Sequence, residues 1–515
     1  MESKKHIKMT SDVVNIINDI EDKFPVDEWI IEKIHIWPLI RLSIFLTLTR
    51  TYVLNSDEYL KSRFSKMVKL LKLFENIIRY SFAYLIDYKK NSKFRQSKVI
   101  FLNDGVSFQK INNKWYSKFC DPFFDYFKSK NISSIMMTPL GEYFIPRYNP
   151  SIFIQPYIDY FRVKSSLISK SKKVWNEQLP EFLIFLDYIN NLNISNITLQ
   201  SIRKQVILIS LIADFFKKIF IKVRPSLGML VSYYGVVGFA FNLACRDFGI
   251  PSIDIQHGIQ GDLHLAYGSW NKVPETGYEL LPTLFWCWSE NEAASIYKWS
   301  QKVSNWHKPI VGGNLFLNYW LSDNSYLVKC YDKKIEAFKN SLKYSRYIIF
   351  TQSHPQGKDV ENIIPVIKNS PSCWFWLIRI HPCNLKIRYD VKKLLRRNRL
   401  VNCEVDIATD YPLYALFRHS DVHVTEISSS VIEAEIFGVP SVITNKCAVE
   451  RFTSQIENGW AVLAYTTEDI IKAINYQLEK RCILKQNQKK VLISSKNALE
   501  FLTQLILKEG NQDDK

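Results

Sequence analysis

Four polar loops in this chain carry the residue types that acid–base and phosphate chemistry need, and each follows an apolar run typical of a buried strand. The first loop is Asn103-Asp104-Gly105, which ends the run 98–103. A carboxylate beside glycine can approach a substrate closely, so Asp104 is a candidate general base. The alternative interpretation is a simple Asp-Gly turn without chemistry.

The second loop is Gln256-His257-Gly258, which ends the run 251–256. A histidine whose pKa lies near neutrality can serve as an acid, a base or a phosphate partner. A single histidine can equally be a structural group whose hydrogen bonds are satisfied. Glycines at 258 and 261 surround it at a predicted strand end, where ligands gather in α/β sheets, and both interpretations stay open.

The third loop is Arg379-Ile380-His381-Pro382, which closes the run 374–380. The proline fixes the turn and removes a backbone donor, so the imidazole of His381 can point across a cleft toward a phosphate or a leaving group. The pair His354-Pro355 follows an earlier predicted strand, and the dipeptide alone is therefore a weak signal.

The fourth loop contains Ser428, Ser429 and Ser430 and leads into a predicted helix with Glu433. Serine hydroxyls and free backbone N–H groups at a helix start can bind phosphate. Ser430 and Glu433 also have the spacing of a capping box. We therefore expect Ser430 to cap the helix and Ser428 and Ser429 to face a ligand.

Two stretches of sequence end a helix and start a strand in the same way. They are Phe248-Gly249-Ile250-Pro251 and Phe437-Gly438-Val439-Pro440. Glycine suits the left-handed position after a helix, and proline cannot continue one. Two such units far apart predict an α/β fold with two separate halves, each built on a parallel sheet. The four polar loops would then lie at the carboxyl ends of strands.

The length of 515 residues is too great for a single core. We place a boundary at the turn-rich loop 268–282. The sequence then predicts a helical N-terminal region (1–95), a first Rossmann-like domain (96–280), a second Rossmann-like domain (281–465) and C-terminal helices (466–515).

The formal net charge is 68 − 50 = +18, which favours an anionic partner: a phosphorylated ligand, an acidic membrane surface or nucleic acid. No helix-turn-helix, zinc or RNA-binding signature supports nucleic acid. The cysteines number nine and include no C-x-x-C pair, which indicates reduced thiols in a cytosolic protein. Neither 37–54 nor 206–221 is apolar enough to cross a membrane, and no signal peptide is evident.

The run 421–440 resembles the donor-binding segment of GT-B glycosyltransferases, and is most similar to bacterial enzymes of capsule and lipopolysaccharide assembly. This resemblance implies two Rossmann-like domains facing a cleft, with a nucleotide-sugar on the C-terminal one. Retaining members carry two glutamates with seven residues between them. Thr425 stands at the earlier position and Glu426 is one residue out of step, which favours inversion.

Transferases that use CMP-sugars are marked by an acidic-acidic-Gly motif, a His-Pro motif and a serine pair. This chain is similar at Asp104-Gly105, at His381-Pro382 and at Ser428-Ser429, whereas Asn103 departs from the first acidic position. The resemblance therefore favours a CMP-sugar donor. It assigns the phosphate to His381, Ser428, Ser429 and Ser430, and the ribose to Glu433.

The expected function is an inverting transfer of a sugar to a surface-polysaccharide or lipid-linked glycan, with catalytic roles for Asp104, His257 and His381. Asp104 or His257 would be the base. The resemblance implies neither a metal nor a cofactor besides the nucleotide-sugar co-substrate. The expected location is the cytoplasm, with peripheral contact at the cytoplasmic face of the inner membrane. The alternatives are a polyol-phosphate transferase of teichoic-acid type, a nucleotide-sugar epimerase and a non-catalytic envelope scaffold.

Overall fold

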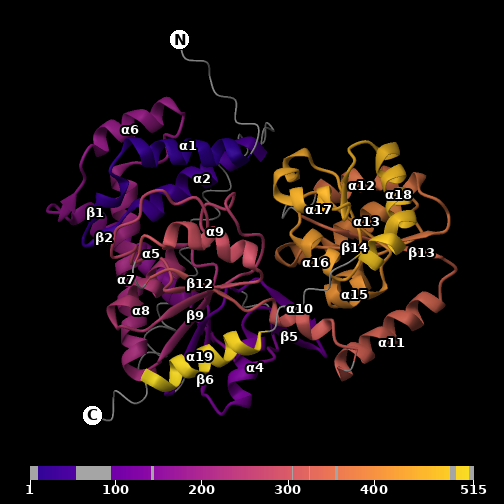
Figure 1. Ribbon diagram of the computed structural model, residues 1–515, viewed down its shortest axis with the longest axis horizontal. Helices are drawn as coiled ribbons and strands as arrows, with labels where there is room; N and C mark the ends of the chain where they lie inside the picture. The colour runs from indigo at the N-terminus through magenta and orange to yellow at the C-terminus, as the bar shows by residue number, and fades with distance from the viewer. Residues whose placement is uncertain are drawn as a thin grey trace.

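The chain folds into two α/β lobes that lie side by side (Figure 1), as seen in a computed structural model. The structure describes residues 10–53, 94–140, 144–303, 306–323, 325–353, 358–487 and 495–509. Each lobe is built on one parallel sheet with helices packed against it. This arrangement confirms the predicted α/β class with two Rossmann-like domains facing a cleft, the GT-B fold.

The first lobe contains a parallel sheet of seven strands. The central strands are buried along their whole length, which explains why their sequences are continuous apolar runs. In spatial order the strands are β12 (Lys308–Val311), β11 (Leu284–Cys287), β10 (Ser252–Ile255), β9 (Leu227–Val231), β3 (Val99–Leu102), β6 (Ser134–Thr138) and β7 (Ile152–Phe153). The helices of this lobe are α4 (Asp121–Ser129), α5 (Gln155–Ser171), α7 (Leu199–Val223), α8 (Val236–Asp247) and α9 (Glu290–Ser300).

The second lobe contains a parallel sheet of six strands. In spatial order they are β15 (Cys403–Glu404), β14 (Trp374–Arg379), β13 (Arg346–Thr351), β16 (Val422–Thr425), β17 (Ser441–Ile443) and β18 (Ala461–Leu463). The helices are α10 (Leu315–Trp320), α11 (Tyr326–Asn340), α12 (Lys358–Asn369), α13 (Arg388–Arg397), α14 (Asp406–Asp410), α15 (Leu413–His419), α16 (Ser430–Ile436), α17 (Thr453–Glu457) and α18 (Thr467–Asn487), and the short helical turns are η3 (Pro382–Ile387), η4 (Lys446–Ala448) and η5 (Glu450–Phe452).

The two helix stops identified from the sequence have the same geometry in both lobes. Gly249 and Gly438 each have φ +68°, the left-handed conformation that favours glycine. The next residue in each case donates its backbone N–H back into the helix, from Ile250 to Cys245 at 2.8 Å and from Val439 to Ala434 at 2.9 Å. The predicted C-caps are thus confirmed, and each leads directly into a strand of the sheet.

The first lobe extends past the boundary predicted at residue 281. The strand β11 pairs with β10, and β12 pairs with β11, so both belong to the first sheet. The loop 268–282 is not a linker, because Tyr278, Leu280 and Leu281 in it are buried.

The C-terminal helix α19 (Lys496–Glu509) also returns to the first lobe, where Leu499, Leu502 and Ile506 join the core around α4 (Figure 1). Because the strands of both sheets are similar apolar runs, the sequence pattern carried no mark of these crossings.

The N-terminal residues 10–53 are helical only in part. The turn η1 (Val26–Glu28) and the strands β1 (Ile30–Ile31) and β2 (Ile34–His35) lie between α1 (Thr10–Lys23) and α2 (Trp37–Val53). The two strands form a small antiparallel sheet with β8 (Glu177–Gln178), which precedes α6 (Phe182–Asn191). The remaining part of the predicted helical region, 54–93, lies outside the described residues.

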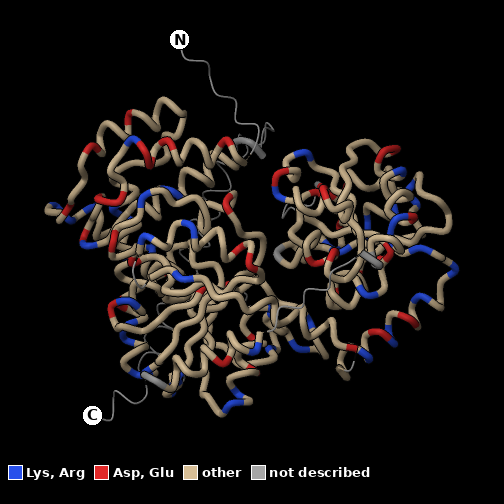
Figure 2. Tube along the Cα trace, viewed as in Figure 1, with Lys and Arg blue, Asp and Glu red and all other residues tan. Residues whose placement is uncertain are grey.

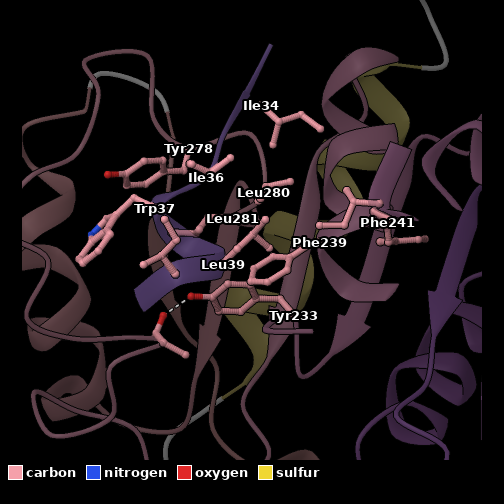
Figure 3. Close-up of a cluster of buried hydrophobic side chains, with 14 of the residues drawn as sticks. Ile34, Ile36, Trp37, Leu39, Tyr233, Phe239, Phe241, Tyr278, Leu280 and Leu281 are labelled. Carbon is pink, nitrogen blue, oxygen red and sulfur yellow. Dashed lines mark hydrogen bonds between the residues drawn. The ribbon is translucent and has the colours of Figure 1, made fainter. Parts of the chain in front are cut away.

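The N-terminal segment packs into the core of the first lobe (Figure 3), where Trp37 and Leu39 gather with Tyr233 and Leu281. The fully buried Arg41 pairs with Glu21 at 2.9 Å and donates to the carbonyls of Leu265, Gly268 and Ser269. This pair therefore ties the N-terminal helices to the loop that follows His257.

Charged residues of both signs are interspersed along the two lobes (Figure 2). Among the described residues, no helix is both long enough and apolar enough to cross a membrane.

Candidate active site

A cavity of about 420 Å³ lies between the two lobes, at the carboxyl ends of their strands. Residues 104 and 257 reach it from the ends of β3 and β10, and residue 381 reaches it from the end of β14. The structure brings together every site residue selected from the sequence, and these are Asp104, His257, His381, Ser428, Ser429, Ser430 and Glu433.

Asp104 lines the cavity and also holds its own turn. Its Oδ1 accepts the backbone N–H groups of Val106 and Ser107, both at 3.1 Å, and its Oδ2 accepts the Ser107 hydroxyl. Gly105 has φ +78°, and a Cβ there would lie 2.6 Å from the Cβ of Leu140. Because three hydrogen bonds from its own turn occupy the Asp104 carboxylate, its oxygens are less available to a substrate hydroxyl.

His257 faces the cavity with its ring held by aromatic neighbours. Its Nε2 lies 3.0 Å from the Tyr234 hydroxyl, and its ring contacts Phe119 edge-to-face with centroids 6.2 Å apart. Nδ1 has no hydrogen-bond partner of normal geometry among the described residues. The Ile255 carbonyl is nevertheless close enough to raise the pKa of the imidazole. Burial lowers the pKa of His257, and the nearby Asp104 carboxylate opposes that shift.

Tyr234 is a site neighbour that sequence analysis missed. It follows β9, and burial raises the pKa of its phenol, which therefore stays protonated. The preceding Ser232 has φ +65° and lines the cavity. Tyr234 could have been found from the sequence, because it lies shortly after a buried strand. That strand, β9, is the neighbour of the strand that precedes His257.

His381 enters the cavity from the second lobe. Its backbone N–H donates to the Gln352 side chain at 3.0 Å, which fixes the loop after β14. Burial lowers the pKa of the imidazole to about 4, and the positive charges of Lys118 and Arg379 add to that shift. His381 is therefore neutral at physiological pH, when it can exchange hydrogen bonds with a phosphate but supplies no charge. The pair His354-Pro355 lies outside the described residues.

The predicted capping box at Ser430 is not formed. Ser430 is 2% exposed, and its hydroxyl lies 3.0 Å from Thr351 Oγ1, 3.2 Å from His423 Nε2 and 2.8 Å from Ser428 Oγ. Ser429 occupies the N-cap position of α16 and makes no side-chain capping bond. Buried polar groups need partners, so Ser430 serves the interior and Ser428 and Ser429 are the better candidates for ligand contact.

Glu433 lies at the cavity wall but faces a tyrosine instead of the backbone. Its carboxylate accepts the hydroxyl of Tyr414, which lies 3.5 Å from the Asn314 amide nitrogen. Ser289 is the N-cap residue of α9, where its hydroxyl oxygen accepts the Asn291 N–H at 3.3 Å.

Two cationic side chains also line the cavity, Lys118 and Arg379. The Arg379 guanidinium donates to the carbonyls of Ala408 and Tyr411, both at 2.7 Å, and burial lowers its pKa to about 10. Lys118 forms no ion pair with a described carboxylate, and its ammonium lies 5.2 Å from the centroid of the Phe119 ring. Sequence analysis missed Lys118 because it lies past a short hairpin, away from any strand end of the main sheets.

The described residues contain no group of three or more His, Cys, Asp or Glu side chains that could hold a metal ion. The described cysteines are free thiols.

No protein-family model matches this sequence, and no curated protein matches it. Similar solved structures are UDP-GlcNAc 2-epimerases and a teichoic acid polymerase. The Neisseria meningitidis epimerase bound to UDP-GlcNAc is 14% identical (TM-score 0.46), with 80% of this chain and 99% of that one covered.

The Methanocaldococcus jannaschii epimerase is also 14% identical (TM-score 0.47), with 79% and 99% covered. The wall teichoic acid polymerase TagF is 10% identical (TM-score 0.46), with 88% and 99% covered. These likenesses are remote, and the fold assignment depends on the two parallel sheets and the cleft between them.

Proposed function

We propose that this protein is an inverting glycosyltransferase that moves a sugar from a nucleotide-activated donor to a glycan acceptor. The observation that carries the proposal is the pair of neutral histidines on opposite walls of one cleft. His257 stands beside a carboxylate, and His381 stands beside two cations. A proton acceptor and a phosphate partner are the two functions that an inverting transfer requires.

In the proposed reaction the donor nucleotide lies on the second lobe, and its phosphate meets His381, Ser428 and Ser429. The acceptor hydroxyl approaches from the first lobe. Its oxygen bonds to the anomeric carbon while its proton passes to a ring nitrogen of His257, and the bond from that carbon to the phosphate oxygen breaks. The nucleotide leaves with the electron pair, and the Asp104 carboxylate stabilises the imidazolium that has formed.

Glu433 would meet the ribose, and of the two candidate bases, Asp104 and His257, we choose His257. Three hydrogen bonds occupy the Asp104 carboxylate, whereas burial keeps His257 unprotonated. We keep a CMP-sugar as the preferred donor, because of the His381-Pro382 and Ser428-Ser429 pattern.

The second candidate is polyol-phosphate transfer, in which the acceptor oxygen attacks phosphorus instead of carbon. Lys118 favours it, since an ammonium without a carboxylate partner suits negative charge that builds on phosphoryl oxygens. His257 would accept the same proton in either reaction. Linkage analysis of the product separates the two, because one yields a glycoside and the other a phosphodiester.

A ligand panel tests the proposal. Thermal unfolding is measured with CMP, CDP, UDP, GDP and their sugar or glycerol conjugates, on wild type and His381→Ala. A ligand at about 100 times its dissociation constant should stabilise the protein by roughly 2.7 kcal/mol. We expect one nucleotide class to stabilise wild type and to lose most of this effect in His381→Ala.

His419→Ala is the matched control, because it removes a histidine of the same lobe that pairs with Asp332 and does not line the cavity. If no ligand of the panel raises the thermal stability of wild type, the proposal is contradicted and a non-catalytic scaffold is favoured. Isomerisation of the donor without an acceptor would favour an epimerase.

The proposed acceptor is a surface-polysaccharide or lipid-linked glycan. The net charge of +18 supports attraction to an anionic bilayer at the cytoplasmic face of the inner membrane. Co-sedimentation with anionic and neutral vesicles tests this contact, and equal recovery from both would contradict it.

A further inference from the structure

The proposed donor carries negative charge, and most polar groups of the cavity cannot balance it. His381 is neutral above its pKa of about 4. The Nη1 atom of Arg379 donates to two backbone carbonyls, so this nitrogen is not available to a ligand. Among the described residues that line the cavity, Lys118 is the cation with neither an ion pair nor a carbonyl partner for its ammonium.

Lys118 directly follows a hairpin that contacts both lobes. The hairpin consists of β4 (Phe108–Ile111) and β5 (Lys114–Ser117) and leaves the first lobe after β3. Its residue Ile111 belongs to a core cluster of the second lobe, and the Tyr116 ring stacks on Phe316 with centroids 5.4 Å apart. Gln109 donates its side-chain amide to the Tyr411 carbonyl at 3.2 Å. The position of Lys118 is therefore fixed relative to both walls of the cleft.

The backbone around Lys118 is also tied to the Asp104 turn. The N–H of Lys118 donates to the Ser107 carbonyl at 3.0 Å, and Ser107 in turn donates to the Asp104 carboxylate. The Lys118 ammonium itself lies over the Phe119 ring, 5.2 Å from its centroid. These contacts limit the freedom that the ammonium would lose on binding a ligand, which is the condition for preorganised electrostatic stabilisation.

The two walls of the cavity approach each other closely at Gly258 and Ser429. A Cβ built on Gly258, beside His257, would lie 4.0 Å from the hydroxyl oxygen of Ser429. A phosphate held by Ser429 is thus within reach of groups from the first lobe.

We propose that Lys118 binds the phosphoryl group of the donor from the first lobe while His381 and Ser429 hold it from the second. The ligand would then tie the two lobes together through its phosphate, and Lys118 would stabilise the charge on the leaving group. The proposal deepens the proposed function and rests on it.

Calorimetric titration of the best nucleotide from the panel tests this assignment, with the matching nucleoside as the phosphate-free probe. In Lys118→Met we expect nucleotide affinity to fall about 10- to 100-fold, since charge-assisted bonds to phosphate are among the strongest that proteins make. Nucleoside affinity should stay within about twofold because the base and ribose contacts are untouched. Lys118→Arg, which keeps the charge, should recover most of the nucleotide affinity.

Lys114→Met is the matched control, because it removes an exposed lysine from the other end of β5. If wild type binds no nucleotide, the proposed function itself fails. If wild type binds and Lys118→Met binds equally well, only the role of Lys118 is overturned. Lys118→Gln replaces the methionine variant if that protein does not fold.

Discussion

His257 and His381 each lie two residues past the end of a parallel strand, one in each lobe, and both face the same cavity. Burial lowers the pKa of both imidazoles. Lys118 lowers the pKa of both imidazoles, but their other charged neighbours differ, because Asp104 raises the pKa of His257 while Arg379 lowers that of His381 further. The comparison teaches that the same residue type at the end of a parallel strand takes its role from charges on other segments.

The supports of the two histidines differ as well. Around His257 they are aromatic, with Tyr234 at Nε2 and Phe119 at the ring edge. Behind the serine loop of the second lobe lies a buried polar network of Thr351, His423 and Ser430. Burial lowers the pKa of His423 to about 3, so this network is uncharged. Under the proposed function, the first lobe would thus orient a base, and the second would provide a neutral platform for an anion.

The largest expected effect is on turnover in His257→Gln. Loss of a general base should reduce kcat by about 10²- to 10⁴-fold, while nucleotide affinity stays within about twofold. Steady-state kinetics and calorimetry on the same preparation measure the two quantities. Retained turnover would show that His257 is not the base, and the proposed difference in role between the two lobes would then be wrong.

The second effect is the converse, in His381→Gln. Loss of a hydrogen bond to a charged phosphate should weaken donor binding by roughly 1.5–3 kcal/mol, or about 10- to 150-fold. The remaining turnover at saturating donor should exceed that of His257→Gln. A variant that binds the donor normally would show that the phosphate does not lie against the second lobe.

A smaller effect is expected in Asp104→Asn, which keeps an oxygen for the turn but removes the charge. Because the Asp104 charge raises the pKa of His257, its loss should lower that pKa and move the acidic limb of the kcat/KM profile to lower pH. We expect kcat to fall about tenfold, since the imidazolium loses its counter-charge. Asp323→Asn is the control, because it removes the charge of an exposed carboxylate that does not line the cavity. A limb that moves to higher pH would contradict the assignment.

The smallest effect concerns the pH dependence of donor binding. His381 has a pKa of about 4, below the usual 6.5, so it is neutral above about pH 5 and gains its charge only under more acidic conditions. Affinity for a nucleotide diester, which has no second phosphate ionisation, should therefore vary less than about twofold between pH 5.5 and 8. An affinity that rises steeply as pH falls through 6.5 would show that His381 binds as imidazolium.

Much of this site could be predicted from the sequence because its residues follow strands. Buried parallel strands are continuous apolar runs, and the Gly249 and Gly438 stops mark where each helix gives way to a strand. Asp104, His257 and His381 were found because they end such runs. The direction of the Ser430 hydroxyl could not be predicted, since its partners Thr351 and His423 come from other strands.

The sequence did not indicate which strands share a sheet or which cations enter the cleft. The strands β11 and β12 resemble those of either lobe, and only the pairing of β11 with β10 and of β12 with β11 assigns them to the first sheet. Lys118 reaches the cavity because the hairpin 108–117 packs on the second lobe, a contact between segments about 200 residues apart, as between Tyr116 and Phe316. Such long-range contacts leave no periodic pattern in the chain.

The most direct test of the central claim is a crystal structure with the tightest-binding nucleotide of the panel. The account predicts density in the 420 Å³ cavity between the lobes, with a phosphate oxygen within hydrogen-bond distance of the His381 imidazole and the Lys118 ammonium. A nucleotide bound elsewhere, or one whose phosphate contacts neither side chain, would contradict it.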